Sequence, residues 1–98
     1  MIVSLQTERG RIEAEESIRG NELLPQVNPD EYPMIGHIDL YGNTIFNRQQ
    51  MVTLLSEVER LKKESFITQT QQESLELVER MCRMGTRKVH RYLWFLGD

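Results

Sequence analysis

The sequence predicts a small α+β domain, in which an antiparallel or mixed β-sheet packs against an antiparallel pair of helices. Short apolar segments rich in β-branched or aromatic residues lie near both ends, and two segments with helical apolar spacing lie between them. A length of 98 residues suits one domain with one core. The expected order is strand, strand, loop, short strand, helix, helix, strand, over a single domain, residues 1–98.

The first two strands are expected to pair as a hairpin. Residues 2–6 (IVSLQ) are too short for a helix, and Gly10 lies in the turn that follows them. Residues 12–18 alternate, which places Ile12, Ala14 and Ile18 on one face. Residues 13–18 would also suit a short helix, so both interpretations stay open.

The segment 20–36 is expected to be extended and rich in turns. Pro25, Pro29 and Pro33 recur at every fourth position, and each one removes a backbone donor and disfavours helical geometry in its predecessor. The apolar residues of the segment favour a loop packed on the core over a flexible linker; they are Leu23, Leu24, Val27, Tyr32, Met34 and Ile35.

Local signals place the start of the first helix at Asn47. Gln50 completes a capping box with Asn47, and Phe46 can staple onto Met51. Apolar residues then repeat with helical spacing to Leu61, and the helix is expected to end near Glu64. The charged residues between them are expected to face water; they are Glu57, Glu59, Arg60, Lys62 and Lys63.

The second helix is expected to begin near Thr68 or Thr70 and to end at Gly85, a residue suited to a left-handed C-terminal position. Its apolar stripe includes Cys82, which is expected to be a buried, inert thiol. The chain then closes with a strand over 89–96, expected to be central in the sheet, beside the first hairpin, and covered by helices on at least one face. Leu93, Phe95 and the first strand could leave one apolar face uncovered, and a homodimer would bury it.

Charge is distributed unevenly along a chain whose net charge is -3. Residues 1–36 contain three basic and seven acidic side chains, whereas a basic stretch over 80–91 contains no acidic residue. The single cysteine and the lack of a leader-like start favour the cytoplasm. The longest apolar run, 92–96, is far shorter than the roughly 20 residues of a membrane span, so no membrane association is expected.

Two motifs carry a resemblance to known proteins. Residues 37–51 read HIDLYGNTIFNRQQM, and residues 92–98 read YLWFLGD. Together they resemble a family of small bacterial proteins of unassigned function, with an H-x-D-x-Y-G-[DN]-T-x-F-N turn and a Y-L-W-F-x-G-D end. The chain departs from that pattern at Leu40, where the family often has proline, and at Asn43, where aspartate is commoner. The resemblance implies architecture and bacterial origin, and no activity.

One candidate for chemistry is a metal site made by His37, Asp39 and His90. Two histidines and one carboxylate match a facial metal triad, and residues 37 and 39 lie on one side of an extended segment. The chain would then be a small metal-dependent enzyme. The alternative is structural, with Asp39 or Asn43 forming an Asx turn around Tyr41 and Gly42.

A second candidate is a nucleic-acid surface in the basic stretch. The net acidity of the chain argues against this interpretation, and cations at the end of a helix are explained by the helix dipole. Its residues would be Arg83, Arg87, Lys88 and Arg91.

The leading hypothesis is a protein-binding module without enzymatic activity or cofactor, which modulates or inhibits a partner in the manner of an immunity protein or antitoxin. No convincing catalytic set is present, and the acidic front third, with the loop over 23–41, would suit a basic partner. The expected contact residues are Tyr32, Met34, His37, Asp39, Tyr41, Asn43 and Arg48.

Overall fold

The computed structural model describes residues 1–18 and 24–97, which form an α+β fold. Residues 20–23 of the predicted loop, Leu23 among them, and Asp98 of the C-terminal motif lie outside these ranges. The elements follow in the order β1 (Ile2–Thr7), β2 (Ile12–Ser17), α1 (Pro33–His37), β3 (Asn43–Phe46), α2 (Arg48–Leu61), α3 (Gln69–Thr86) and β4 (Arg91–Leu96).

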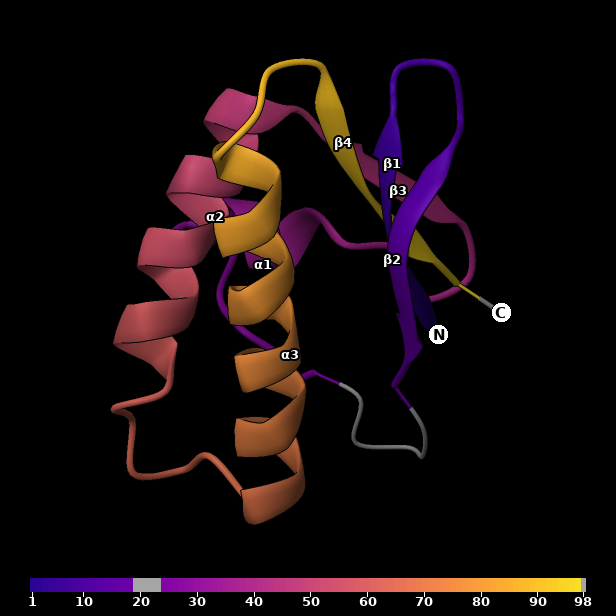
Figure 1. The fold of residues 1–98 in the computed structure, drawn as a ribbon. Coiled ribbons are helices and arrows are strands. Elements are labelled where there is room, and N and C mark those ends of the chain that lie inside the picture. Colours follow the sequence, from indigo (N-terminus) through magenta and orange to yellow (C-terminus); the bar gives the residue numbers. More distant parts are fainter. Residues whose placement is uncertain (19–23, 98) are drawn as a thin grey trace.

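The sheet has the strand order β2-β1-β4-β3, and every neighbouring pair is antiparallel. The last strand is therefore central and lies beside the first hairpin, as predicted (Figure 1). Ile2 pairs with Leu96, which places the beginning and the end of the described chain next to each other. The short strand β3 pairs with the other side of β4.

Helices α2 and α3 form the predicted hairpin and cover one face of the sheet (Figure 1). That face presents alternate strand residues, among them Val3, Leu5, Leu93 and Phe95, which are at most 1% exposed. Phe46 packs edge-on against Phe95, with ring centroids 5.7 Å apart. Each side chain buried in this layer stabilises the fold by about 1.5–3 kcal/mol through loss of water contact.

The hairpin of β1 and β2 settles the strand-or-helix alternative for residues 12–18. They form a strand, and Gly10 in the turn adopts a positive φ of 84°. A bulge lies where Leu5 pairs with Ala14 and Gln6 pairs with Ile12. Because cross-strand partners share a face, Ile12 and Ala14 point to opposite faces, and the simple alternation predicted from the sequence is wrong there.

The loop before β3 contains a helix that the proline pattern did not predict. Pro33 begins α1, and its fixed φ and missing N–H are both compatible with the first helical position. Tyr32, the residue before it, keeps a non-helical backbone with φ -131° and ψ 71°. The prediction that residues 20–36 are wholly irregular is therefore wrong over 33–36, because proline was interpreted only as a helix breaker.

Both long helices begin with a capping box, at Asn47 with Gln50 as predicted and at Thr68 with Gln71, which is one of the two predicted starts. The end of α3 differs from prediction, because the helix continues through Gly85 to Thr86. A Cβ atom on Gly85 would lie 2.6 Å from Met51 Sδ and 2.9 Å from Leu5 Cδ1. Glycine is needed there for the close approach of α3 to α2 and β1. The left-handed residue in this region is His90, with φ 59°.

The opposite face of the sheet is not covered by any described element. The sequence placed Leu93 and Phe95 on such a face, but both point toward the helices and are fully buried. The register instead places Tyr92, Trp94 and Leu96 on the open side. Within 1–18 and 24–97, no helix is both long and apolar enough to cross a membrane.

The Gly85 packing predicts that Gly85→Ala destabilises the protein. The methyl group overpacks the junction of α3, Met51 and Leu5, so we expect the free energy of unfolding to fall by about 1–3 kcal/mol, although alanine favours helices by about 1 kcal/mol. Urea denaturation measures this change. Ser56→Ala, at an exposed position of α2, is the control and should change stability by less than about 0.5 kcal/mol. Equal effects of both substitutions would contradict the packing argument.

Candidate functional site

A buried carboxylate from α2 anchors the loop that leads to β3. Glu57, expected to face water, is only 2% exposed. Its Oε1 and Oε2 atoms accept hydrogen bonds from Met34 N at 3.1 and 3.0 Å, and Oε1 accepts another from Ile35 N at 3.0 Å. These amides belong to the first turn of α1, so Glu57 caps a helix that lies 22 residues earlier in the chain.

This cap accounts for every free donor at the start of α1. Pro33 has no N–H, Met34 and Ile35 donate to Glu57, and Gly36 N donates to Tyr32 O at 2.8 Å within the helix. Tyr32, at the N-cap position, supplies no side-chain cap. A carboxylate at a helix N-terminus also complements the helix dipole.

The next turn of α2 fixes Tyr32. The guanidinium of Arg60 lies over the Tyr32 ring, 4.8 Å from its centroid, and donates to Glu31 O at 3.1 Å. The Tyr32 hydroxyl donates to Glu64 Oε1 at 3.5 Å. Burial of the tyrosine, followed by the nearby Glu64 carboxylate, raises the pKa of Tyr32 above its ordinary value. Glu57 and Arg60 of α2, with Glu64 just after the helix, therefore hold the loop.

Two Asx turns shape the loop on either side of α1. Asn28 Oδ1 accepts from Asp30 N, and Asp39 Oδ1 accepts from Tyr41 N, each at 2.9 Å. The second of these confirms the structural alternative for Asp39. Asp39 N also donates to Thr44 Oγ1 at 2.9 Å, and Gly97 N donates to Gly42 O at 2.7 Å. The turn is thus tied to both β3 and the chain segment after β4.

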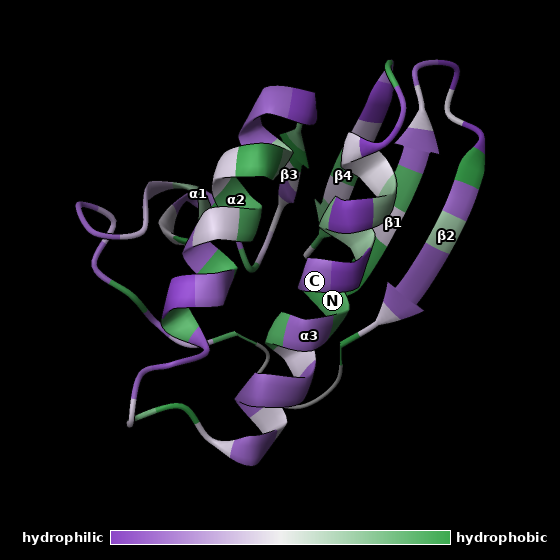
Figure 2. Cartoon of the chain, turned by 60° about the vertical axis from the view of Figure 1, so that its left-hand side comes forward, coloured by the Kyte–Doolittle hydropathy of each residue, from purple (hydrophilic) through white to green (hydrophobic). Residues whose placement is uncertain are grey.

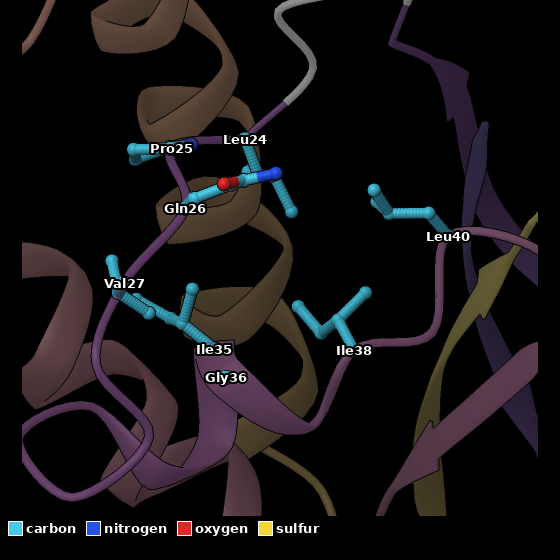
Figure 3. A pocket seen from close by; sticks show the side chains of 8 residues that line it. All are labelled: Leu24, Pro25, Gln26, Val27, Ile35, Gly36, Ile38 and Leu40. Atoms are coloured by element: carbon cyan, nitrogen blue, oxygen red, sulfur yellow. The ribbon is translucent and has the colours of Figure 1, made fainter.

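The anchored loop borders an apolar groove, which we define by its lining residues as the loop groove. It has a volume of about 240 Å³, below the roughly 300–1,000 Å³ of typical small-molecule pockets. Figure 3 shows Ile35 and Ile38 facing the segment 24–27, with Leu40 on the far side. The lining contains one polar side chain, Gln26, and no ionisable one; its members are Leu24, Pro25, Gln26, Val27, Ile35, Gly36, Ile38 and Leu40.

Close packing at a glycine and at several apolar side chains fixes the path of the loop. A Cβ atom on Gly36 would lie 2.9 Å from Pro29 Cα, so glycine allows α1 to pack closely against the Asx turn at Asn28. Leu24, Val27 and Ile38 are half-buried and pack against the core, whereas Leu40 is 40% exposed. The groove can accept an apolar side chain, and its lining offers no group for acid, base or nucleophilic chemistry.

The predicted contact residues divide into two groups. His37, Asp39, Tyr41 and Asn43 are exposed and lie along the turn between α1 and β3; the Tyr41 side chain is 84% exposed. The other group comprises Tyr32, which is 6% exposed, Met34, which is half-buried on the core, and Arg48, which lies at the far end of β3 and donates from Nε to Thr86 O. Only the first group lies together at one surface. Ile38 and Leu40, which line the groove, were not among the predicted contact residues, although their alternate spacing indicates that they share a face.

The structure does not assemble the proposed metal triad. His37 lies against the Phe46 ring, with centroids 6.5 Å apart, and Asp39 is engaged in its Asx turn. His90 precedes β4 and lies 3.5 Å from a carboxylate oxygen of Glu8. Among residues 1–18 and 24–97, no three His, Cys, Asp or Glu side chains are grouped to hold a metal ion. The structure therefore does not bring His37, Asp39 and His90 together and gives the metal-site hypothesis no support.

Several arginines of the basic stretch form ion pairs with acidic side chains that lie far from it in the sequence. Arg91 binds Glu13 through two hydrogen bonds and thereby lowers the pKa of Glu13 below its ordinary value. Arg80 binds Glu16 at 3.1 Å. Arg83 binds Glu59 at 2.8 Å and lies 3.8 Å from Glu79. Arg87 and Lys88 line a hollow that also contains Glu13.

This pairing weakens two interpretations based on charge. Arg83 and Arg91 already face carboxylates and therefore offer less attraction to phosphate groups, which weakens the case for a nucleic-acid surface at Arg83, Arg87, Lys88 and Arg91. Glu13 and Glu16 of the acidic front are likewise paired, which weakens electrostatic steering of a basic partner.

Cys82 is placed as the sequence predicted, in the core between the helices and the sheet. Burial raises the pKa of the Cys82 thiol to about 12, and the nearby Glu79 carboxylate adds to the shift. A thiol that stays protonated and inaccessible is not a nucleophile.

The sequence matches no protein-family profile, and no curated protein or solved structure is significantly similar to it. The resemblance of residues 37–51 and 92–98 to small bacterial proteins therefore stays a prediction.

Glu57→Ala should destabilise the protein by about 3 kcal/mol, because the amides of Met34 and Ile35 lose a charged acceptor in a buried place. Glu57→Gln keeps one acceptor oxygen and should lose less. Urea denaturation gives both values. Glu59→Gln is the matched control, since it removes an exposed ion pair two residues along the same helix and should cost at most about 1 kcal/mol. A loss for Glu57→Ala no larger than that of the control would contradict the capping role.

The Cys82 thiol should resist alkylation by iodoacetamide in the folded protein at pH 8. At that pH a thiol with a pKa near 12 has about 1,000-fold less thiolate than one with a pKa near 9. In urea above the unfolding midpoint the same thiol should react fully. Mass spectrometry of quenched samples measures the modified fraction, and rapid labelling under native conditions would show that the helix pair opens readily.

Proposed function

We propose that this chain is a protein-binding module without catalytic activity, which modulates or inhibits a protein partner through the loop groove and the turn beside it. The observation that carries the proposal is the anchoring of an apolar groove by the buried Glu57 carboxylate. Fixing a loop before binding lowers the entropic cost of association, which is a property of binding surfaces built for one partner.

The shape and chemistry of the surface support a protein as the partner. The groove accepts an apolar side chain, and Tyr41 stands exposed beside it at the tip of an Asx turn. An exposed tyrosine next to an apolar depression, with polar groups such as Asp39 and Asn43 around it, has the composition of a small interface centre with a polar rim. Immunity proteins and antitoxins are one class that acts in this way.

The proposed setting is a bacterial cytoplasm. The resemblance carried by residues 37–51 and 92–98 supports a bacterial origin. The only cysteine of the chain is a buried free thiol, which suits a reducing compartment. Self-association of the chain would need a different surface, the open face of the sheet.

Partner capture tests the proposal with one groove variant and one control. Leu40→Asp places a charge at the rim of the groove, on a residue exposed enough to be replaced without loss of fold. Val52→Asp places the same charge on a 56% exposed position of α2 outside the groove. We expect a partner from the source cell to be captured by the wild type and by Val52→Asp, and its recovery to fall at least about tenfold with Leu40→Asp.

Quantitative mass spectrometry of the three captures, at low and moderate salt, identifies such a partner. Its activity should then change when the purified wild-type chain is added and stay unchanged with Leu40→Asp. If every captured protein binds the groove variant and the wild type equally, the groove is not a binding surface and the proposal fails.

A further inference from the structure

The open face of the sheet is uncovered, carries an apolar patch and has almost no charge. In the described chain every helix lies on the other side of the sheet or beside it (Figure 1). The register places eleven side chains on the open face, of which only Glu15 carries a full charge at neutral pH; they are Ile2, Ser4, Gln6, Ile12, Glu15, Ser17, Asn43, Ile45, Tyr92, Trp94 and Leu96.

The apolar members form one patch centred on Trp94. Trp94 pairs with Ser4 on one side and with Ile45 on the other, and Leu96 pairs with Ile2. Ile2 and Ile45 are 38% and 45% exposed, whereas Trp94 and Leu96 are half-buried. Ser4 is completely buried under its neighbours and accepts a hydrogen bond from Gln6 Nε2 at 3.1 Å. The patch is thus well packed, and its outer surface is apolar.

The chemistry of this face limits what can cover it. An aromatic sheet surface that binds single-stranded nucleic acid combines stacking side chains with cations for the phosphates. The open face has Tyr92 and Trp94 but no lysine or arginine among the residues that the structure describes on it. The same lack of cations argues against an anionic membrane surface. The occupant must be an apolar surface that brings little charge.

We infer that a second copy of this chain covers the open face, so that two sheets pack face to face in a symmetric dimer. A second copy presents the required surface, since it is apolar at Trp94 and carries its single carboxylate, Glu15, on an edge strand. A two-fold axis parallel to the strands would place β2 of one copy over β3 of the other. The two Glu15 carboxylates then lie at opposite edges and do not repel each other.

Association along the sheet edge is less favourable than association through this face. The edge strand β2 carries Glu13, Glu15 and Glu16, so two such edges would bring like charges together. Figure 2 shows β2 as a largely hydrophilic strand. The other edge, β3, is only four residues long. Both features protect the edges and leave the open face as the surface available for self-association.

The size of the face sets the expected strength of the dimer. Four strands spaced about 4.8 Å apart, three of six residues and β3 of four, give a face of roughly 20 by 20 Å, or about 400 Å² before side-chain relief is added. Specific interfaces bury about 600–1,000 Å² on each partner. The flat area of the face is below this range, so we expect a weak dimer whose population depends on protein concentration.

Analytical ultracentrifugation of the full chain from micromolar to millimolar concentration tests the inference. The weight-average mass should rise from 11.6 kDa toward twice that value. Ile45→Lys and, separately, Ile2→Lys should raise the dissociation constant at least about tenfold, because each places an unpaired cation in the apolar patch. Val52→Lys, on the exposed side of α2, is the control and should behave as the wild type. Circular dichroism confirms that each variant is folded.

Three results would overturn the inference. The first is a wild-type mass that stays at 11.6 kDa over the whole range. The second is a folded Ile45→Lys or Ile2→Lys variant that dimerises as strongly as Val52→Lys, since the dimer would then use another surface. The third is binding of an oligothymidylate that quenches Trp94 fluorescence and dissociates the dimer, which would make nucleic acid the occupant. Partner capture through the loop groove can succeed or fail in each of these cases, so the two proposals are separable.

Discussion

The carboxylate of Glu57 is the interaction on which the loop before β3 depends. Helix α1 has five residues, too few to persist on local propensity alone. It forms because Pro33 starts it without an unsatisfied donor and because Glu57 accepts from the next two amides. Removing a charged group from water is costly, and three hydrogen bonds, together with the helix dipole, offset that cost. The position of Ile35 and Ile38, and with them one wall of the loop groove, follows from this contact.

Features with a local signal could be predicted from the sequence, whereas those that depend on a distant partner could not. The capping boxes at Asn47 and Thr68, the turn at Gly10 and the Asx turn at Asp39 each involve residues a few positions apart. In the sequence Glu57 looks like any other charged helix residue, because its role depends on contact with α1. Gly85 looks like a helix end, because its close contacts with Met51 and Leu5 involve residues that are distant in the sequence.

The residues of the candidate site divide in the same way, into those with a local signal and those placed by distant contacts. Exposed residues of the turn, such as Tyr41, were predictable because a turn must lie at the surface. Tyr32 was misplaced because its burial depends on Arg60 of α2 and on Glu64, which follows that helix. The histidines and Asp39 of the predicted metal triad lie apart for a similar reason: the register of β1 against β4 places His90 beside Glu8, and this contact joins residues that are distant in the sequence.

The strand order has a consequence for how the fold forms during synthesis. Strand β4 is made last among the described elements, yet it separates β1 from β3 and supplies the pairing that each of them needs. Until it leaves the ribosome, the β1-β2 hairpin has no third strand, and an isolated hairpin is at best marginally stable in water. Glu13 and Glu16 form their ion pairs only after Arg91 and Arg80 have been made, so until then these two carboxylates of the front third remain unpaired. The sheet is therefore completed only after β4 has been made, in a step that joins β1 and β3 through it.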